Sequence, residues 1–335
     1  MRNKRQRRFK LGVIIVFSCL WIWGAFVGWR NLNVNHNTTS KADTSQSTKL
    51  KKITIGYQKG DILEITKVHG NLDADMKEKG YRIVWRSFQS GAALLQALAT
   101  GNLDFGRTGN TPPITSQAAG TDVVYVGAGY SKYNGSGILI PNSSSMTSVK
   151  DLAGKSIAVN KGSSAHYLLV RALESVGLSI DDVKLVYLDP SAARIAFTQG
   201  KVDAWAIWDP YTADAQINAD AKLLVSGKNY TTDRDFILST RAFTNKHADL
   251  TSTVVDGVAI ALDWANDNKS ELSNQLQKSL KLDKEVTDLT VSRRTYGVSK
   301  LSQKIIQEQQ EIADLWYRLG YIDKKIDVDK NVVGD

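Results

Sequence analysis

The feature that most constrains the fold of this 335-residue chain is an internal repeat. Ile53 to Gly60 (ITIGYQKG) predicts a strand that ends in Gln-Lys-Gly, and about 102 residues later Ile157 to Gly162 (IAVNKG) ends in Asn-Lys-Gly. Ala93 to Phe105 (ALLQALATGNLDF) predicts a helix and an Asp-bearing strand, and AARIAFTQGKVDA matches it about 99 residues later. Two matched pairs at nearly one offset predict two copies of one supersecondary unit.

Short β-branched runs alternate with helical patterns in both copies, which is typical of an α/β fold with mostly parallel strands. The ligands of open α/β sheets bind outside the carboxyl ends of the strands, so two facing lobes would enclose a cleft. We place the first crossing between the lobes near Tyr130 to Gly137 and the return near Asp233 to Arg241. Helical periodicity over 252–266, 269–280 and 302–319 then predicts helices that complete the first lobe.

The predicted organisation is therefore a two-lobed α/β protein with a hinge between the lobes, preceded by a membrane segment. Its parts are a basic segment with a transmembrane anchor or signal at 1–30, a flexible linker at 31–51, a first lobe at 52–132 and 241–335, and a second lobe at 133–240. The linker is rich in Asn, Thr and Ser, as flexible spacers are.

The formal net charge of +9 belongs to the N-terminus rather than to the body of the chain. Seven basic residues precede residue 31, where no acidic residue occurs, and the remainder carries 36 basic against 34 acidic groups. A nearly neutral body cannot neutralise the run of phosphates that non-specific nucleic-acid binding requires. The charge therefore excludes nucleic acid as the partner of the body.

Leu11 to Trp29 is a run without charge, long enough to cross a bilayer, and positive residues precede it. Because positive residues stay on the cytoplasmic side, the body of the chain is expected outside the membrane. An uncleaved anchor fits the length of the run, which lacks a small-x-small cleavage site. A cleaved signal and a lipoprotein modified at Cys19 remain alternatives.

The motifs of the main enzyme classes are missing from the sequence. Cys19 is the only cysteine, so the body has no thiol nucleophile, and its histidines lack metal-binding spacing. Ser163, Ser164 and His166 lie close together, but no G-x-S-x-G elbow accompanies them. No dinucleotide or P-loop motif occurs either. We expect no catalysis, no metal and no cofactor.

Three sequences place a helix start beside a strand end, where free N–H groups can face an anion. They are Lys161 to His166, Thr108 to Pro113, and Ser90 with Gly91. A single Ser or Thr at such a place usually only caps its helix. Several starts that converge on one cleft would instead make an anion site from backbone dipoles.

The segment Val202 to Tyr211 (VDAWAIWDPY) puts two tryptophans three residues apart at a strand end. They could be ordinary core residues. The repeat, however, aligns this loop with Gly106 to Pro112 of the first copy, so it should also face the cleft. We therefore expect Trp205, Trp208 or both to form an aromatic wall suited to an apolar organic tail.

Five segments are similar to the aliphatic-sulfonate-binding proteins of ABC importers, a family of type II periplasmic-binding-protein fold. They are IGYQKG, TGNTPPI, QAAGTDVVYVG, KGSSAH and VDAWAIWDPY, and the likeness covers roughly Lys52 to Tyr321. The resemblance implies a receptor that closes on an anionic head between its lobes. It implies Gln58, Asn110, Ser163, Ser164, His166, Trp205 and Asp209 as ligand-facing. Asn110 stands where some relatives carry Asp, which would weaken a preference for a ligand with an ammonium group.

With the helix starts and the aromatic loop added, the predicted ligand-binding set is Gln58, Thr108, Gly109, Asn110, Gly162, Ser163, Ser164, His166, Trp205, Trp208 and Asp209. The expected partners are a small organic anion, an ABC permease with its ATPase subunits, and the cell membrane through the N-terminal segment, with the receptor itself a monomer. A receptor of the same architecture for taurine, nitrate or a thiamine-precursor pyrimidine remains the alternative.

Overall fold

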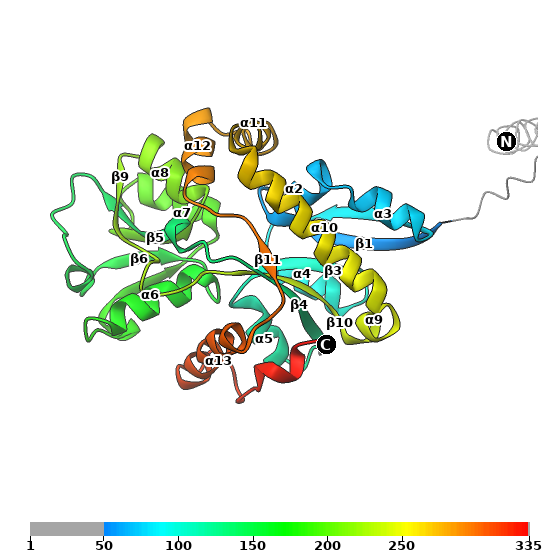
Figure 1. The fold of residues 1–335 in the computed structure, drawn as a ribbon. Helices are drawn as coiled ribbons and strands as arrows, with labels where there is room; N and C mark the ends of the chain where they lie inside the picture. Colours follow the sequence, from blue (N-terminus) through cyan, green and yellow to red (C-terminus); the bar gives the residue numbers. More distant parts are fainter. Residues whose placement is uncertain (1–49, 334–335) are drawn as a thin grey trace, which may run out of the picture. The chain divides into compact units, whose positions relative to one another are not determined.

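The computed structural model describes residues 50–333, which lie within one compact unit, Lys49–Asp335. Two β-sheets form the frame of this unit, and helices pack on both (Figure 1). Each sheet and its helices make one lobe. The predicted two-lobed α/β fold is therefore confirmed for this part of the chain.

The first lobe is built on a six-stranded sheet. Its strands are β1 (Lys51–Tyr57), β2 (Tyr81–Ser87), β3 (Phe105–Gly109), β4 (Val123–Gly129), β10 (Asp235–Thr240) and β11 (Val298–Ser299). Its early helices are α2 (Ile62–His69), α3 (Leu72–Glu78), α4 (Gly91–Ala99) and α5 (Pro112–Ala118). The strand order is β11-β4-β10-β3-β1-β2.

The second lobe is built on a five-stranded sheet. Its strands are β5 (Ser136–Pro141), β6 (Ser156–Val159), β7 (Lys184–Tyr187), β8 (Ala204–Trp208) and β9 (Ala221–Ser226), in the order β7-β6-β8-β5-β9. Its helices are α6 (Ser164–Glu174), α7 (Pro190–Thr198) and α8 (Tyr211–Asn218), with short 3-10 turns η1 (Tyr133–Gly135), η2 (Val149–Leu152) and η3 (Ile180–Asp182).

The two sheets share one topology, which explains the repeat in the sequence. β2, β1, β3, β10 and β4 of the first sheet correspond in order to β7, β6, β8, β5 and β9 of the second. In each sheet the strand that enters from the other lobe, β10 or β5, runs antiparallel to its neighbours. The two lobes thus have the same topology, and each receives its antiparallel strand from a chain segment that crosses over from the other lobe.

The repeated aspartate serves the same purpose in both lobes. Asp104 accepts a hydrogen bond from the N–H of Thr54 at 2.7 Å, and Asp203 accepts one from the N–H of Ser156 at 2.8 Å. Each aspartate lies just before β3 or β8 and joins it to the neighbouring strand β1 or β6. A carboxylate suits this place because it can accept from a backbone donor where the strand pairing begins.

The two crossings between the lobes lie side by side. Lys132 donates its backbone N–H to the carbonyl oxygen of Thr232 at 3.1 Å, and Gly227 donates to that of Tyr133 at 3.1 Å. The first crossing falls within the predicted range. The return crossing occupies residues 227–234, earlier than predicted, because residues 235–240 form β10 and pair with β3 and β4. That strand therefore belongs to the first sheet and not to the range 133–240 assigned to the second lobe.

The chain after the return crossing is mostly helical. Its elements are α9 (Arg241–Lys246), α10 (Ala248–Asp267), α11 (Lys269–Leu280), α12 (Lys284–Ser292), α13 (Gln303–Arg318) and η4 (Val328–Asn331). The helices predicted over 252–266, 269–280 and 302–319 are confirmed, whereas α12 was not predicted. Helix α10 packs on α2 and α3, and α13 on α5, so both complete the first lobe.

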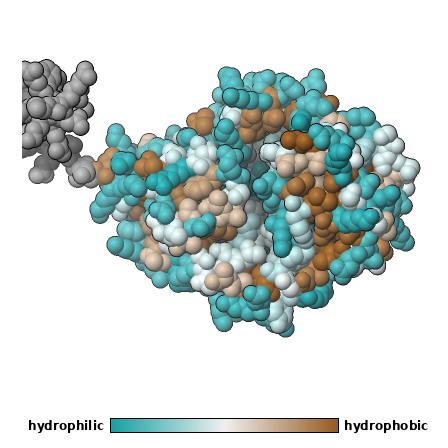
Figure 2. Space-filling view, turned by 180° about the vertical axis from the view of Figure 1, so that it is seen from behind, coloured by the Kyte–Doolittle hydropathy of each residue, from teal (hydrophilic) through white to brown (hydrophobic). Residues whose placement is uncertain are grey.

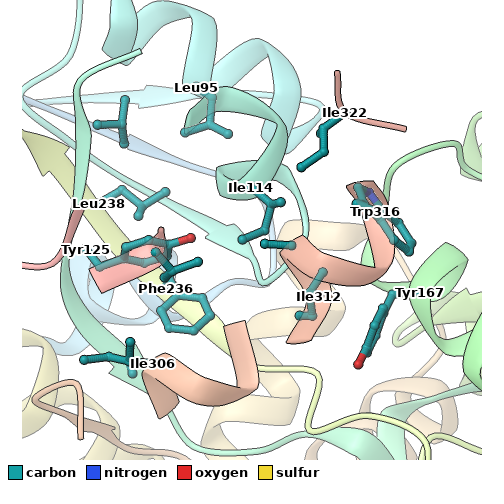
Figure 3. Close-up of a cluster of buried hydrophobic side chains, with 14 of the residues drawn as sticks. Leu95, Ile114, Tyr125, Tyr167, Phe236, Leu238, Ile306, Ile312, Trp316 and Ile322 are labelled. Atoms are coloured by element: carbon teal, nitrogen blue, oxygen red, sulfur yellow. The ribbon is translucent and has the colours of Figure 1, made fainter. Parts of the chain in front are cut away.

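One hydrophobic cluster of the first lobe extends into the second. It joins Ile114, Tyr125 and Phe236 to Trp316 on α13, and it includes Tyr167 on α6 (Figure 3). The rings of Tyr167 and Trp316 lie 5.7 Å apart between centroids. Helix α13 therefore contacts both lobes beside the crossings.

The predicted membrane segment at 1–30 and linker at 31–51 fall almost wholly outside the described residues. Within residues 50–333, no helix combines the length and the apolar character needed to span a bilayer. Lys51 itself begins β1, so the predicted linker ends no later than residue 50.

Candidate ligand-binding site

A cleft of about 1450 Å³ lies between the lobes, lined by residues of both. Figure 2 shows the unit from behind, where a hollow opens between its two halves and both hydrophilic and hydrophobic residues border it. Six helices begin at the cleft, each after a strand of one sheet: α2, α4 and α5 in the first lobe, and α6, α7 and α8 in the second. An open α/β sheet binds ligands at this end of its strands.

Three of these helix starts already carry a carboxylate. Asp61 caps α2 and accepts from the N–H groups of Leu63 and Glu64 at 2.9 and 2.8 Å. Asp189 precedes α7, and Asp209 lies just before α8 and accepts from Ala213 at 3.0 Å. A negative side chain at the positive end of a helix stabilises that helix and repels a second anion. These three starts are therefore poor sites for an anionic ligand.

The other three starts carry no charge, but they differ in donors. Helix α5 has proline at its first two positions, which removes two N–H groups. Helix α4 is capped by Ser90, whose hydroxyl accepts from Ala93 at 3.3 Å, and α6 by Ser163, which accepts from His166 at 3.2 Å. The earlier N–H groups of both helices have no acceptor within the helix. One uncharged helix start from each lobe thus opens into the cleft.

The two lobes touch at the start of α6. Ser164, the first residue of α6, lies against Gly109 at the end of β3, so that a Cβ on Gly109 would come within 2.5 Å of the Ser164 Oγ. The TGN and KGSS segments are therefore in contact across the cleft, through Gly109 and Ser164, which are 55 positions apart along the chain.

A network of buried ion pairs forms the floor of the cleft. Asp235, fully buried, pairs with Arg107, with Arg294 at 2.6 Å and with Lys132 at 3.4 Å. Lys132 also pairs with Asp233 at 3.0 Å. These cations line the cleft, but carboxylates already neutralise them. These cations were not predicted as site residues, although an arginine within the mostly buried strand β3 is itself a signal.

A further ion pair joins the lobes across the cleft. Arg293, which directly follows α12 of the first lobe, donates to Asp209 of the second at 3.2 Å and also to Gln216 on α8. Burial raises the pKa of Asp209 to about 6, although Arg293 opposes the shift. Arg293 therefore favours the ionised form of Asp209 in this arrangement of the lobes.

The pKa values of the other two buried carboxylates, Asp61 and Asp235, shift in opposite directions. Burial raises the pKa of Asp61 to about 6, with Arg107 acting in the opposite direction. Burial acts in the same direction on Asp235, but Arg107, Lys132 and Arg294 outweigh it and hold its pKa well below the usual range. Asp235 is therefore ionised throughout the neutral range, whereas Asp61 is close to its titration.

Apolar and aromatic side chains make part of the cleft wall. They come from both lobes and include Phe88, Leu95, Trp208, Tyr211, Leu276 and Leu280. Together with the uncharged helix starts, they give the cleft a polar region for an anionic head and an apolar region for an organic tail.

Seven of the predicted site residues line the cleft: Gln58, Gly109, Gly162, Ser163, Ser164, Trp208 and Asp209. Trp205 does not. It is fully buried in an apolar cluster with Phe197 and Ile207, because residues three apart in a strand point to opposite faces. Trp208 is the member of the pair that faces the cleft.

Thr108, Asn110 and His166 also lie behind the cleft surface rather than on it. Thr108 and Asn110 are buried, and the Asn110 carbonyl oxygen accepts from Gln309 at 2.8 Å. His166 is fully buried among Tyr187, Trp316 and Tyr321. A position one turn into α6 points toward the lobe contact made by α13, which the sequence pattern could not reveal.

Two lobes of one topology, joined by paired crossings around a cleft, define a periplasmic-binding-protein-like receptor. Residues 83–271 match the model of the family described as NMT1/THI5 like. An aliphatic sulfonates-binding protein of Escherichia coli K12 is 36% identical over 83% of this chain and 87% of its own length. A Bacillus subtilis 168 protein of the same description is 38% identical over 85% of this chain and 86% of its own length.

The structure is similar to that of an alkanesulfonate-binding protein from Xanthomonas axonopodis pv. citri bound to MOPS. The two chains are 35% identical, with a TM-score of 0.79 over 85% of this chain and 99% of the other. The chain belongs to the NMT1/THI5-like family and, within it, to the aliphatic-sulfonate-binding proteins.

Proposed function

We propose that this protein is the extracytoplasmic substrate-binding component of an ABC importer and that it captures aliphatic sulfonates for sulfur uptake. The observation that carries the proposal is the pair of uncharged helix starts, α4 and α6, at a cleft whose other starts carry carboxylates or prolines. A sulfonate has three acceptor oxygens and one delocalised charge, so backbone N–H groups and hydroxyls from two sides can satisfy it.

The ligand would contact both lobes. Gln58 and Gly109 belong to the first lobe, and Gly162, Ser163, Ser164, Trp208 and Asp209 to the second. The serines and glycines would hold the head, and Trp208 would cover the tail. Contacts from both sides favour the closed state over the open one, because a ligand shifts an equilibrium only by its differential affinity for the two states. The importer's permease and its ATPase subunits would then receive the closed form.

The alternative ligands make different demands on the cleft. Nitrate needs no apolar wall. A cationic pyrimidine needs an available carboxylate. At the helix starts of the cleft, Asp209 is paired with Arg293, Asp61 accepts from two N–H groups of α2, and Asp189 accepts from Asn160. Taurine, a sulfonate with an ammonium group, would use the same two helix starts. It is therefore the alternative ligand that differs least from an alkanesulfonate in what it requires of the cleft.

Calorimetric titration of the full chain with methanesulfonate, a longer alkanesulfonate, taurine, sulfate and nitrate tests the proposal. The longer alkanesulfonate should bind tightest, by about 0.8 kcal/mol for each CH2 that the apolar wall covers. Tighter binding of nitrate, or binding of a cationic pyrimidine in preference to any sulfonate, would refute the assignment.

We also propose that Leu11 to Trp29 remains as an uncleaved anchor that keeps the receptor at the outer face of the membrane. The length of the uncharged run and the absence of a small-x-small cleavage site support this. The protein should then resist carbonate extraction and keep its first 30 residues. A mature N-terminus at Cys19 or beyond, measured by mass spectrometry, would favour a lipoprotein or a cleaved signal instead.

A further inference from the structure

His166 links the start of α6 to the C-terminal part of the chain. Its Nδ1 atom lies 3.2 Å from the backbone nitrogen of Gly162, and its Nε2 atom lies 3.2 Å from the hydroxyl of Tyr321. That hydroxyl lies a further 3.2 Å from the hydroxyl of Tyr187. One continuous chain of hydrogen bonds therefore runs from the Gly162 peptide to two tyrosines.

The directions of the two bonds at His166 follow from the first one. A backbone N–H can only donate, so Nδ1 of His166 must accept from Gly162. Burial, with a smaller effect from Lys161, lowers the pKa of His166 to about 4, so the ring is neutral and its single proton is on Nε2. Nε2 then donates to Tyr321, whose hydroxyl is also hydrogen-bonded to that of Tyr187.

This chain crosses from one lobe to the other. Gly162, His166 and Tyr187 belong to the second lobe, whereas Tyr321 follows α13, which completes the first. Arg318 and Glu174 form an ion pair at 2.5 Å in the same region. The ring of Trp316, on the last turns of α13, lies 5.4 Å from that of His166. The end of α13 and the turn after it therefore dock on α6 and β7.

We propose that His166 is a positioning residue that orients the Gly162 peptide at the anion-binding start of α6 only while Tyr321 is docked. The inference rests on the proposed function, since it takes the α6 start as part of the ligand site. His166 does not line the cleft and touches no ligand. It acts by holding Gly162 from behind, and Tyr321 holds His166 in turn.

The consequence is a coupling between lobe contact and ligand site that acts through His166, which lies behind the cleft, whereas Tyr321 and Trp316 border the cleft themselves. When the lobes separate at the end of α13, Nε2 of the buried ring loses its acceptor. The ring also loses the Trp316 and Tyr321 side chains that bury it, so it gains rotamers in which Nδ1 no longer accepts from Gly162. The α6 start is therefore ordered in the closed arrangement and loosened in the open one.

Two substitutions at His166 separate the two ends of the ring. The amide of asparagine occupies the place of Nδ1, so His166→Asn keeps an acceptor for Gly162 and loses the bond to Tyr321. The amide of glutamine reaches the place of Nε2, so His166→Gln keeps the bond to Tyr321 and loses Gly162. Tyr321→Phe removes only the hydroxyl, and Tyr317→Phe, at an exposed tyrosine one turn earlier, is the matched control.

The first measurement needs no ligand: amide hydrogen exchange at Gly162 in the full chain. We expect Tyr321→Phe and His166→Gln to speed this exchange about tenfold and Tyr317→Phe to leave it unchanged. Exchange at Gly162 that is the same in Tyr321→Phe as in the wild type would overturn the inference. This outcome is independent of whether the wild type binds a sulfonate, so it is distinct from failure of the proposed function.

The second measurement is the affinity for the best alkanesulfonate. Tyr321→Phe should lower it about three- to tenfold, chiefly through faster dissociation, with the melting temperature of the free protein little changed. The double variant His166→Gln/Tyr321→Phe should bind no more weakly than the single variant that has the lower affinity, because both substitutions act through one chain of bonds. Losses that add independently would show that the two residues are not coupled.

Discussion

The same structural position is used differently in the two lobes. Asp61 in the first lobe and Ser163 in the second each follow a Lys-Gly pair, and each caps the helix that leaves the first strand of the repeat. The aspartate brings a full negative charge to the start of α2, where Glu64 adds a second carboxylate that accepts from Gly60 at 2.5 Å. The serine leaves the start of α6 neutral.

The difference shows how a duplicated fold can become asymmetric. Two identical starts facing each other would have offered two equivalent anion sites. The carboxylates on α2 restrict the proposed anion site to α6 and to α4, the other helix start capped by serine. The first lobe instead supplies buried cations that are held by Asp235 and do not need a ligand for their neutralisation.

The largest effect should come from removing the anion that holds the first lobe's cations. Asp235→Asn leaves Arg107 and Arg294 without their buried partner and Lys132 with Asp233 alone, and we expect a loss of about 3 to 5 kcal/mol in the free energy of unfolding. Denaturant unfolding measures it. Asp122→Asn, whose pair with Arg241 is exposed, is the matched control and should cost less than about 1 kcal/mol. Equal losses of stability in the two variants would show that the buried ion-pair network does not stabilise the first lobe more than an exposed ion pair does.

Acid should weaken the wild type for the same reason. The pKa of Asp235 is lowered in the folded state, so its contribution is present above pH 4 and is lost as the pH falls further.

Making the second lobe resemble the first should abolish binding. Ser163→Asp puts a carboxylate at the start of α6, and repulsion across about 4 Å at an effective dielectric constant of 20 is worth several kcal/mol. We expect sulfonate affinity to fall at least about 100-fold, while the helix stays capped and the melting temperature does not drop. Ser302→Asp makes the same change at the start of α13 and should bind normally. Retained affinity in Ser163→Asp would move the anion away from α6.

Neutralising the charge on α2 should change the pH dependence of stability. The pKa of Asp61 is raised to about 6 in the folded state, so its ionised form is unfavourable above that pH. Asp61→Asn should therefore gain up to about 3 kcal/mol relative to the wild type between pH 4 and pH 7.5. Asp151→Asn should show the opposite sign, because backbone hydrogen bonds lower the pKa of that exposed carboxyl. If the difference in stability between Asp61→Asn and the wild type does not vary with pH, folding does not raise the pKa of Asp61.

The smallest effect should distinguish hydroxyls at two starts of the same lobe. Ser164→Ala removes a hydroxyl from the neutral start of α6, and we expect sulfonate affinity to fall by about 1 to 2 kcal/mol. Ser191→Ala makes the same change in the first turn of α7, which carries Asp189, and should have no effect. Calorimetric titration compares the two. An effect of Ser191→Ala as large as that of Ser164→Ala would contradict the proposal that carboxylates exclude the anion from the start of α7.

The sequence predicted much of the fold because the repeat carries its information locally. The helices after Gly60 and Gly162 and the two lobes follow from spacing and periodicity, although β1 and β6 end three residues before these glycines, at Tyr57 and Val159. The return crossing was placed too late, because β10 joins the first sheet by long-range pairing with β3 and β4. Nothing in the residues 235–240 themselves identifies the sheet to which they pair.

The cleft was predicted less completely than the fold. Loop residues such as Ser163 and Trp208 were found because a strand end directs them to the cleft. Arg293 and Lys132 were missed because their partners are distant in sequence, and His166 was assigned to the ligand because its neighbours Trp316 and Tyr321 come more than 140 positions later. Contacts between lobes are set by how the domains meet, and no local pattern records that.

Gly109 sets a mechanical limit on the receptor. A Cβ on Gly109 would come within 2.5 Å of the Ser164 hydroxyl oxygen, so no side chain fits between the backbone of one lobe and this side chain of the other. A larger residue at position 109 would require Ser164 to turn away or the two lobes to stay further apart. A residue without a side chain thus permits the close approach of the two halves.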